Sequence, residues 1–363
     1  MPSGLKVVVS ELADSPSDAI DRAMSLVPME VPGPGPSEVV IAIASASVGW
    51  VDLIMSSGQY QHMAKPPYTP GLEYAGVVTA TGDQVEHVRV GDRVLVDGFL
   101  AGPRSLGAYQ GYGGFATHAV APAAAVHPIP GTLSFDQACN LLGNYETAYH
   151  CLIARGQIQP GETVLIHGAS GSTGLAMVHV AKLRGATVIA TGRSDAKLAV
   201  VKAEGADHVV NVRAEDGGQR QFRDDIKALT GGRGVDVVAD GVGGDISLES
   251  LRCVRFGARY LIVGWASTPA VAPGRGQRGV QAANTLPTNL IMMKGLDVLG
   301  CPAAITVQHD PRKRVERFAE VWRWAENGLV RPHVSHQFAL ADFKDALRAK
   351  LRGDVIGGCV LHP

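Results

Sequence analysis

The sequence predicts an α/β protein in which a β-rich domain is joined to a doubly wound, parallel-sheet domain. Three observations lead to this expectation: the length of the chain, a change of texture near residue 140, and a glycine-rich loop at 167–174. At 363 residues the chain exceeds the size at which a single core usually stops growing, so two domains are expected. With 46% hydrophobic and 18% charged residues, it has ample apolar material for two cores.

Before residue 140 the sequence consists of short strand-like runs separated by Pro and Gly, which predicts an antiparallel, barrel-like β domain. These runs are EVVIAIASASV (38–48), YAGVVTATG (74–82), DRVLVDGF (92–99) and FATHAVAP (115–122).

After residue 140, strand-like and helix-like segments alternate, which predicts parallel βαβ units with right-handed crossovers. The strand-like segments are TVLIHG (163–168), TVIATG (187–192), HVVN (208–211), VDVVADG (235–241) and ARYLIVGW (258–265). From about Val298 the texture is mixed again, so we expect this last segment to fold back onto the first domain. The expected domains are therefore 1–139 with 298–363, and 140–297.

The charge balance argues against two classes of partner. The 33 basic and 34 acidic residues almost cancel, so no electrostatic footprint favours nucleic acid or an anionic membrane. No apolar run is long enough for a membrane helix, and the first residues, MPSGLKVVVSELADSP, reach acidic side chains too early for a signal peptide. We therefore expect a cytoplasmic protein without a nucleic-acid or membrane partner.

The cysteines do not form a cluster. They are Cys139, Cys151, Cys253, Cys301 and Cys359, far apart and without a CxxC pair. Neither a disulfide framework nor a clustered zinc site is expected, and small buried thiols are the favoured interpretation.

The loop HGASGSTG places three glycines between a strand and a helix. The N-terminus of a helix presents unpaired N–H groups and a partial positive charge, so it binds phosphate where no side chain intervenes. Gly168 permits the tight turn, Gly171 lets a pyrophosphate approach the backbone, and Gly174 lets the helix pack against the sheet. A loop whose glycines serve only the turn is the alternative. We expect a dinucleotide to bind at Gly168, Ser170, Gly171, Ser172, Thr173 and Gly174.

The end of the next strand decides which dinucleotide is bound. An acidic residue there accepts the ribose 2′-hydroxyl of NAD, whereas a positive charge favours the 2′-phosphate of NADP. This strand ends at Gly192 and Arg193, and Lys197 follows on the next helix, so we expect NADP(H). Asp195 complicates this expectation, because it is either the ribose acid of an NAD enzyme or a residue that caps the helix.

Many motifs beyond the glycine loop are shared with one family. They include VDLIMSSGQY (51–60), PYTPGLEYAGVVTATGDQV (67–85), GYGGFATHAV (111–120), GADHVVN (205–211), GVDVVADGVGGD (234–245) and NLIMMKGLDVLG (289–300). On these motifs the chain resembles the medium-chain dehydrogenase/reductases, and within them the zinc-free quinone oxidoreductases. The resemblance implies a GroES-like catalytic domain, a Rossmann cofactor domain, an active cleft between them, and a homodimer that joins the two Rossmann sheets edge to edge.

In the zinc alcohol dehydrogenases of this family, a Cys and the His of a GHE motif bind the catalytic zinc. The matching stretches here are SVGWVD and GLEYAG, so Gly49 or a neighbour replaces the Cys and Leu72 replaces the His. Leucine cannot coordinate a metal, and the clustered cysteines of the structural zinc lobe are missing around 97–113. We therefore expect no metal site and a structural role for Glu73.

Without zinc as a Lewis acid, the feasible reaction is hydride transfer from NADPH to an acceptor that is already electrophilic. Quinones and α,β-unsaturated carbonyls fit, because the anion formed on the acceptor needs only hydrogen-bond donors and a proton. Tyr60 matches a pocket tyrosine of the quinone oxidoreductases and is the first candidate donor, the alternative being a core residue. Tyr112, with Tyr109 in the same glycine-rich loop, is the second candidate, and Trp50 is expected to form a hydrophobic wall.

The resemblance also implies contacts at the nicotinamide end of the cofactor. Thr147 is expected at the nicotinamide, Val242 and Gly264 along the cofactor, and Leu299, Gly300 and Cys301 against the carboxamide. Cys301 is either a small packing residue or a reactive thiol.

The chain departs from the family at several positions. Gly49 stands where bacterial relatives have Asn, Ile54 where some have a tyrosine, and Tyr145 and Glu146 where relatives have Gly and Leu. These changes alter the expected pocket.

The leading expectation is an NADPH-dependent, zinc-independent reductase of quinones or enones, and two other functions stay open. An enoyl-thioester reductase, acting on coenzyme A or carrier-protein substrates, is favoured if the insertion 266–287 binds phosphate through Arg275 and Arg278. A non-catalytic NADPH-binding structural or sensor protein is favoured by the missing Asn and by Ile54.

Overall fold

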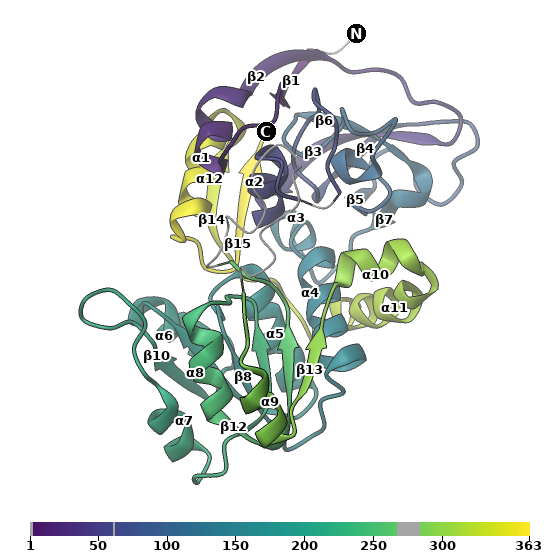
Figure 1. Ribbon diagram of the computed structural model, residues 1–363. Helices are drawn as coiled ribbons and strands as arrows, with labels where there is room; N and C mark the ends of the chain where they lie inside the picture. Colours follow the sequence, from purple (N-terminus) through teal and green to yellow (C-terminus); the bar gives the residue numbers. More distant parts are fainter. Residues whose placement is uncertain (1–2, 61, 267–283) are drawn as a thin grey trace. The chain divides into compact units, whose positions relative to one another are not determined.

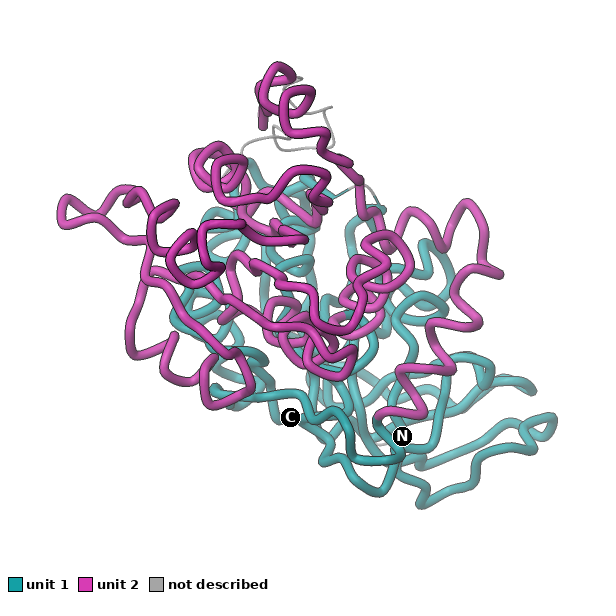
Figure 2. The backbone as a smooth tube through the Cα atoms, turned by 90° about the horizontal axis from the view of Figure 1, so that it is seen from below, with its two compact units in different colours: residues 1–143, 272–280, 325–363 teal, residues 144–271, 281–324 magenta. Residues whose placement is uncertain are grey.

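The computed structural model describes residues 3–60, 62–266 and 284–363. These residues form two compact units, which Figure 2 colours teal and magenta. Unit 1 takes residues up to 143 and from 325 onward, and unit 2 takes 144–266 and 284–324. Each unit has its own sheet and its own hydrophobic core. Across the described ranges, no helix combines the length and the apolar character needed to cross a bilayer.

The chain passes between the units at 143/144 and at 324/325, whereas the sequence analysis expects 139/140 and 297/298. Residues 298–324 belong to unit 2, because β13 (Asp297–Gly300) pairs in parallel with β12 (Val254–Ile262). The segment that returns to the first unit therefore begins only after residue 324.

Helix α11 (Arg312–Glu326) is held on unit 2 by a buried acid of α4 (Leu142–Tyr149). The carboxylate of Glu146, which is 2% exposed, binds the guanidinium groups of Arg314 at 2.6 Å and Arg317 at 2.9 Å. Removing Glu146 would leave the positive charges of Arg314 and Arg317 without their counter-ion, so this contact fixes α11 to unit 2.

Unit 1 is built on a seven-stranded sheet and a two-stranded hairpin, drawn in Figure 1. The sheet runs in the order β14-β15-β3-β4-β5-β7 with β6 beside β3, and only β14 and β15 are parallel. Its strands are β3 (Glu38–Ser47), β4 (Tyr74–Thr81), β5 (Arg93–Val96), β6 (His118–Pro122), β7 (Val126–Pro128), β14 (Val334–Ala339) and β15 (Gly358–His362). The hairpin pairs β1 (Ser3–Val9) with β2 (Met24–Glu30).

Short helices cover and connect these strands. They are α1 (Pro16–Asp18), η1 (Ala19–Ala23), α2 (Trp50–Ser56), η2 (Gly102–Ser105), η3 (Ala123–Ala125), α3 (Phe135–Ala138), η6 (Leu340–Asp342) and α12 (Phe343–Arg352). Strand β3 forms because its Val- and Ile-rich sequence suits a pleated, buried surface, and Val39 and Ile41 are fully buried. Helix α12 closes the core with Ala346 and Leu347.

The start of α2 is fixed by a buried carboxylate. Asp52 accepts the N–H of Gly49 at 2.8 Å, which caps the helix, and the N–H of Gly71 at 2.9 Å, which ties the helix to a distant loop. Burial raises the pKa of Asp52 to about 6, although the two N–H groups oppose the shift. Trp50 and Tyr60 are thereby placed at the two ends of one anchored segment.

Unit 2 is a six-stranded parallel sheet in the order β10-β9-β8-β11-β12-β13. Besides β12 and β13, its strands are β8 (Thr163–Ile166), β9 (Thr187–Gly192), β10 (His208–Asn211) and β11 (Val235–Asp240). This is the 3-2-1-4-5-6 order of the Rossmann fold, with the reversal between β8 and β11. The expected doubly wound sheet is therefore confirmed.

The helices of unit 2 connect these strands. Besides α4 and α11, they are η4 (His150–Arg155), α5 (Ser172–Leu183), α6 (Asp195–Ala203), α7 (Arg223–Leu229), α8 (Asp245–Cys253), α9 (Thr288–Lys294) and α10 (Ala303–His309). Helix α5 buries Leu175, Val178 and Ala181, which recur at helical spacing.

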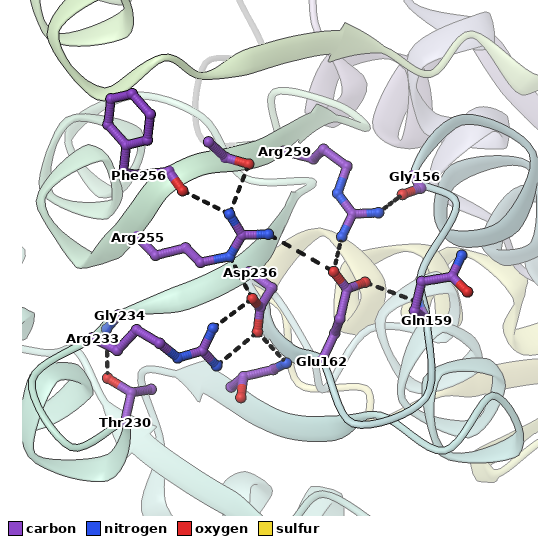
Figure 3. A network of polar contacts seen from close by, with 12 residues as sticks. Gly156, Gln159, Glu162, Thr230, Arg233, Gly234, Asp236, Arg255, Phe256 and Arg259 are labelled. Atoms are coloured by element: carbon purple, nitrogen blue, oxygen red, sulfur yellow. Dashed lines mark hydrogen bonds and ion pairs between the residues drawn. The ribbon is translucent and has the colours of Figure 1, made fainter.

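At the amino ends of its strands, unit 2 carries a network of arginines and carboxylates, shown in Figure 3. Asp236, near the start of β11, accepts hydrogen bonds from Arg233 at 2.7 Å and from Arg255. Glu162, just before β8, binds Arg259 and accepts the N–H of Gln159 at 2.8 Å. The network joins three strands at the edge opposite to their carboxyl ends, so it stabilises the sheet from that side.

Candidate active site

Glycines lie at or just after the carboxyl ends of four parallel strands in unit 2. Gly168 follows β8, Gly241 follows β11, Gly264 follows β12, and Gly300 ends β13. Doubly wound sheets bind ligands where the strand order reverses, because the loops on the two sides of that point leave in opposite directions. The reversal between β8 and β11 therefore marks the candidate cofactor site.

Two glycines of the loop are required by the geometry of the protein itself. Gly168 has a φ of +64°, a left-handed conformation that L side chains rarely adopt, and a Cβ there would lie 3.1 Å from a methyl group of Val242. A Cβ at Gly174 would stand 2.3 Å from the carbonyl oxygen of Gly168 and 2.7 Å from the Cα of Ala169. Helix α5 thus packs directly against the loop, and Val242 borders it.

Other glycines at this edge have no such requirement. Among the described residues, a Cβ at Gly171 would meet only the carbonyl oxygen of Gly168, at an ordinary distance of 3.4 Å, and a Cβ at Gly241 or Gly300 would meet no atom within 4 Å. The missing side chains instead leave an open cradle along the strand ends. The phosphates and sugars of a dinucleotide fit such a cradle, because nothing holds them away from the backbone.

The start of α5 is tied to α4 beside this cradle. The hydroxyl of Thr173 donates to the side-chain oxygen of Asn144 at 3.1 Å. Thr147 lies three positions after Asn144 on α4, so the two residues share one helix face. Ser170 and Ser172 flank Gly171 and are partly exposed. The residues expected to hold the phosphates therefore surround the start of α5, with Thr147 on the neighbouring helix.

A buried histidine lies beneath the loop. His167 Nδ1 is 2.7 Å from the Thr191 hydroxyl, and Nε2 is 2.6 Å from the Ser250 hydroxyl. Because Ser250 donates its own proton to the carbonyl of Ile246, it accepts the Nε2 proton of His167. Burial lowers the pKa of His167, although the Asp240 carboxylate opposes this shift.

Asp240 fixes the loop on the other side of the reversal. Its carboxylate accepts the N–H groups of Val242 at 2.8 Å and Gly243 at 3.0 Å, and the hydroxyls of Ser247 and, at 2.7 Å, Tyr260. Burial alone would raise its pKa, but nearby His167 and these donors hold it below the usual range. Val242 is thereby placed against the glycine loop by an ionised, buried carboxylate.

Positively and negatively charged side chains lie together at the end of β9. Arg193 is exposed and donates to a backbone carbonyl, and Lys197 is partly buried on α6. The carboxylate of Asp195 accepts a hydrogen bond from Asn211, at the end of β10, at 2.8 Å. The structure thus brings Gly192, Arg193 and Lys197 to the same strand end as Asp195, and it gives Asp195 a partner within the protein.

The end of β13 completes this edge of the sheet. The N–H of Cys301 donates to the carbonyl of Ile262 at 3.0 Å, which extends the pairing of Leu299 and Gly300 with β12. The Cys301 thiol is buried, and a hydrogen bond from the Cys151 thiol lowers its pKa. All five cysteines of the chain are buried, as the sequence analysis expects.

The expected catalytic residues all lie in unit 1. Trp50 is partly buried and packs against the main core. Tyr112 lines a surface cavity of about 520 Å³ beside Met29 and Pro32. The Tyr109 hydroxyl donates to Glu38 at 2.8 Å, and burial together with Glu38 raises its pKa to about 12. The structure therefore gives Tyr109 and Tyr112 partners other than Tyr60.

Tyr60, which is 8% exposed, lies in a polar and aromatic cluster. Its hydroxyl accepts a hydrogen bond from Nη2 of Arg104 at 3.3 Å, and its ring meets the ring of His62 edge-on at 5.7 Å. The Arg104 guanidinium lies 4.6 Å from the centre of the Phe99 ring. Burial, followed by the charge of Arg104, lowers the pKa of His62.

At the position of the absent zinc ligands, the carboxylate of Glu73 accepts the N–H of Gly143 at 2.5 Å, and Leu72 is buried. Within the described part of the chain, no group of three or more His, Cys, Asp or Glu side chains is placed to hold a metal ion. Most of the insertion 266–287, with Arg275 and Arg278, lies outside the described residues.

The structure places every expected cofactor residue in unit 2, on the carboxyl edge of its sheet or on α4 and α6 beside that edge. Sequence reasoning missed the residues beneath this edge and the neighbours of Tyr60, namely Asn144, His167, Thr191, Asp240, Ser250, Tyr260, His62 and Arg104. Asp240 could have been predicted as a site residue, because it is an acid that directly ends an apolar strand-like run.

Comparisons with known proteins agree with this architecture. The family described as Zinc-binding dehydrogenase matches residues 172–324, and the Alcohol dehydrogenase GroES-like domain matches 35–131. The chain is 31% identical over 330 residues to a quinone oxidoreductase-like protein 2 homolog of Nematostella vectensis, covering 90% of this chain and 82% of the relative. It is 31% identical over 317 residues to human quinone oxidoreductase, covering 87% and 86%.

Solved structures share the fold along the whole chain. A probable oxidoreductase from Mycobacterium abscessus is 28% identical, with a TM-score of 0.79 and coverage of 100% and 99%. The Escherichia coli quinone oxidoreductase, solved in complex with NADPH, is 22% identical, with a TM-score of 0.76 and coverage of 99% and 100%, and it shows the fold alone.

The two units define a two-domain oxidoreductase with a GroES-like and a Rossmann part. The chain belongs to the medium-chain dehydrogenase/reductase family, in its quinone oxidoreductase branch.

Proposed function

We propose that the protein is an NADPH-dependent, zinc-independent reductase that transfers hydride to quinones or to the activated C=C bonds of α,β-unsaturated carbonyls. The observation that carries this proposal is the open cradle at Gly171, Gly241 and Gly300, in a chain of the quinone oxidoreductase branch. Leu72 supports the zinc-free reaction, because a hydrocarbon stands at a position where a metal ligand is needed.

The preference for NADPH rests on the end of β9. Arg193 is exposed there and Lys197 follows one turn later, so two positive charges lie near the place where a 2′-phosphate would bind. The carboxylate of Asp195 is already bound by Asn211, which makes it a poorer acceptor for a ribose hydroxyl.

The residues of the chain bind and orient the reactants. The start of α5, with Gly168 to Gly174, would hold the pyrophosphate, and Thr147, Val242, Gly264 and residues 299–301 would hold the nicotinamide end. Bound NADPH supplies the hydride. Tyr60 donates a hydrogen bond to the carbonyl oxygen of the acceptor, which stabilises the negative charge that develops on that oxygen. Trp50, at the start of α2, excludes water from the apolar part of the acceptor.

The test is the consumption of NADPH, with NADH as a control, by chelator-treated protein offered one simple quinone and one simple enone. Consumption of NADPH, much faster than that of NADH, supports the proposal, and the better acceptor chooses between the two substrate classes. Tight NADPH binding without consumption would contradict it. Turnover of an enoyl thioester would then identify the enoyl-thioester reductase, and no turnover of any acceptor would favour the non-catalytic NADPH-binding protein.

We also propose that the protein is a homodimer joined through the edge of the unit 2 sheet. Among the described strands, β13 is the terminal strand of that sheet, so its outer side is the place where a second copy would pair. Phe256 is 77% exposed and Met292 is 73% exposed, and such large apolar side chains favour an interface.

A further inference from the structure

The side chain of Arg104 lies in a group of four residues of unit 1, which we call the Arg104 cluster: Tyr60, His62, Phe99 and Arg104. The guanidinium stacks over Phe99 at 4.6 Å, lies 6.0 Å from the centre of the Tyr60 ring, and donates to the Tyr60 oxygen. The two aromatic rings therefore hold the cation in one place.

Two polar atoms of this cluster are buried without a hydrogen-bond partner among the described residues. They are Nε2 of His62 and Nε of Arg104. Native proteins leave few such atoms, because each loses its hydrogen bonds to water on burial. Two of them in one cluster indicate that a molecule with hydrogen-bonding oxygen atoms completes it.

Arg104 also lacks a counter-ion within the described ranges. Its contacts are those to Tyr60 and Phe99, and no carboxylate lies within ion-pair distance. Asp52 is affected by the Arg104 charge through space, but its carboxylate is bound by the N–H groups of Gly49 and Gly71. A partly buried cation without a partner is stabilised by a bound anion. The cluster therefore favours a negatively charged oxygen.

We propose that the Arg104 cluster binds the acceptor oxygen that becomes negatively charged on hydride transfer, and that Arg104 is a positioning residue that acts through Tyr60. This inference rests on the proposed function. Arg104 occupies a lone pair of the Tyr60 oxygen, so the Tyr60 proton is left for the ligand oxygen. The adjacent positive charge strengthens that hydrogen bond. The ligand class is a planar, conjugated carbonyl compound whose reduced form is an enolate or a hydroquinone anion.

The inference is tested by the binding of 4-nitrophenolate, a planar conjugated oxygen anion, to protein saturated with NADP⁺. Absorbance titration measures the dissociation constant at a pH where the phenol is ionised. Arg104→Gln keeps amide donors but removes the charge, and we expect it to weaken binding about 10- to 100-fold. Arg93→Gln is the matched control, because Arg93 stacks on Phe135 at the same 4.6 Å but lies outside the cluster. It should bind like the wild type.

Two further variants separate positioning from a structural role. Arg104→Lys keeps the charge and should recover part of the affinity that Arg104→Gln loses. Tyr60→Phe removes the donor, and in that background Arg104→Gln should cost far less than it does alone. If the fold-losses in phenolate affinity of the two single variants multiply in the double variant, Arg104 does not act through Tyr60 and this role is overturned. Thermal melting identifies any variant that fails to fold, and Arg104→Lys then carries the test.

The outcome is separable from that of the proposed function. Wild-type protein that binds 4-nitrophenolate through Arg104, but consumes no NADPH with quinone or enone, would retain the anion site and refute the proposed reaction. Consumption of NADPH together with equal phenolate binding by wild type and Arg104→Gln would retain the reaction and overturn the site. If only water occupies the Arg104 cluster, wild type and Arg104→Gln should bind phenolate equally, which overturns the site.

Discussion

The imidazole of His167 and the hydroxyl of Ser250 meet at 2.6 Å, although 83 positions separate them in the sequence. This contact joins the residue after β8 to α8, and the Thr191 contact at 2.7 Å joins it to β9. The base of the glycine loop is therefore held by buried side chains of its neighbours.

Replacing His167 with Ala should lower the free energy of unfolding by about 2–4 kcal/mol, because it removes two buried hydrogen bonds and opens a cavity. NADPH affinity should fall with it, because the loop loses its support. Urea denaturation and an NADPH titration measure both effects. His309→Ala, at an exposed position of α10, is the control and should change stability by less than about 0.5 kcal/mol. Equal stability of the two variants would contradict the supporting role.

Gly171→Ala and Gly174→Ala should separate a binding glycine from a packing glycine. The Cβ of Ala at 171 meets only an oxygen at 3.4 Å, so the variant should fold like the wild type but bind NADPH at least about 10-fold more weakly. The Cβ of Ala at 174 would stand 2.3 Å from an oxygen, so this variant should lose thermal stability even without cofactor. Melting curves with and without NADPH give both results. Unchanged NADPH affinity in Gly171→Ala would refute the cradle.

Arg193→Ala combined with Lys197→Ala should weaken NADPH binding about 10- to 100-fold and leave NADH binding nearly unchanged, since only NADPH carries the 2′-phosphate. Fluorescence titration with both nucleotides measures the ratio. Asp195→Asn is the matched variant for the alternative. If it weakens NADH binding while the double variant leaves NADPH binding intact, Asp195 is the ribose acid and the expected preference is wrong.

Asp236 should make part of the stability depend on acid pH. Burial alone would raise its pKa, but hydrogen bonds from Arg233, the N–H of Thr163 and Arg255 lower it to about 2. A carboxylate with a lowered pKa stabilises the fold above its unfolded pKa of about 3.9, and this contribution is lost as pH falls toward 2.

Asp236→Asn should therefore lower the free energy of unfolding by about 2–4 kcal/mol at neutral pH, and the difference from wild type should shrink below pH of about 4. Denaturation at a series of pH values measures this. Asp310→Asn, which removes an exposed pair with Arg312, is the control and should show little change. A difference that stays constant into acid would exclude ionic stabilisation by Asp236.

Phe256→Glu and Met292→Glu should convert the proposed dimer into a monomer, because each places a charge in an apolar interface. Sedimentation at several concentrations measures the mass. Phe343 is buried in unit 1, so it cannot serve as a surface control. The matched control is Leu106→Glu, at an exposed leucine of unit 1. Wild-type protein that sediments as a monomer would refute the proposed dimer.

The sequence predicts most of this fold because its strands and helices have clear periodicities and are divided by glycine. It does not predict that residues 298–324 join unit 2. The basic side chains of α11 resemble a solvated helix face, and their partner Glu146 stands 168 and 171 positions away. Ion pairs of that separation are decided by the packing of whole elements, which local patterns do not contain.

The candidate site likewise contains residues that the sequence predicts and residues that it does not. The glycine loop was predictable, since the conformation of Gly168 and the packing at Gly174 are local requirements of a strand that turns into a helix. The neighbours of Tyr60 were not, because Arg104 reaches it from η2, 44 positions later. Whether the catalytic and cofactor residues act as assigned stays a prediction.

The position of β15 bears on how the protein is made. This strand lies between β14 and β3, and Val360 pairs with Ser47 across an interval that contains all of unit 2. During synthesis, β3 to β7 leave the ribosome long before β15, so the end of β3 at Ala46 and Ser47 lacks its neighbour. Unit 2, whose strands are contiguous in the chain, is able to fold in that interval. The nascent first unit therefore waits with an open sheet edge, and it is the stage at which we expect chaperone binding or misassembly between chains.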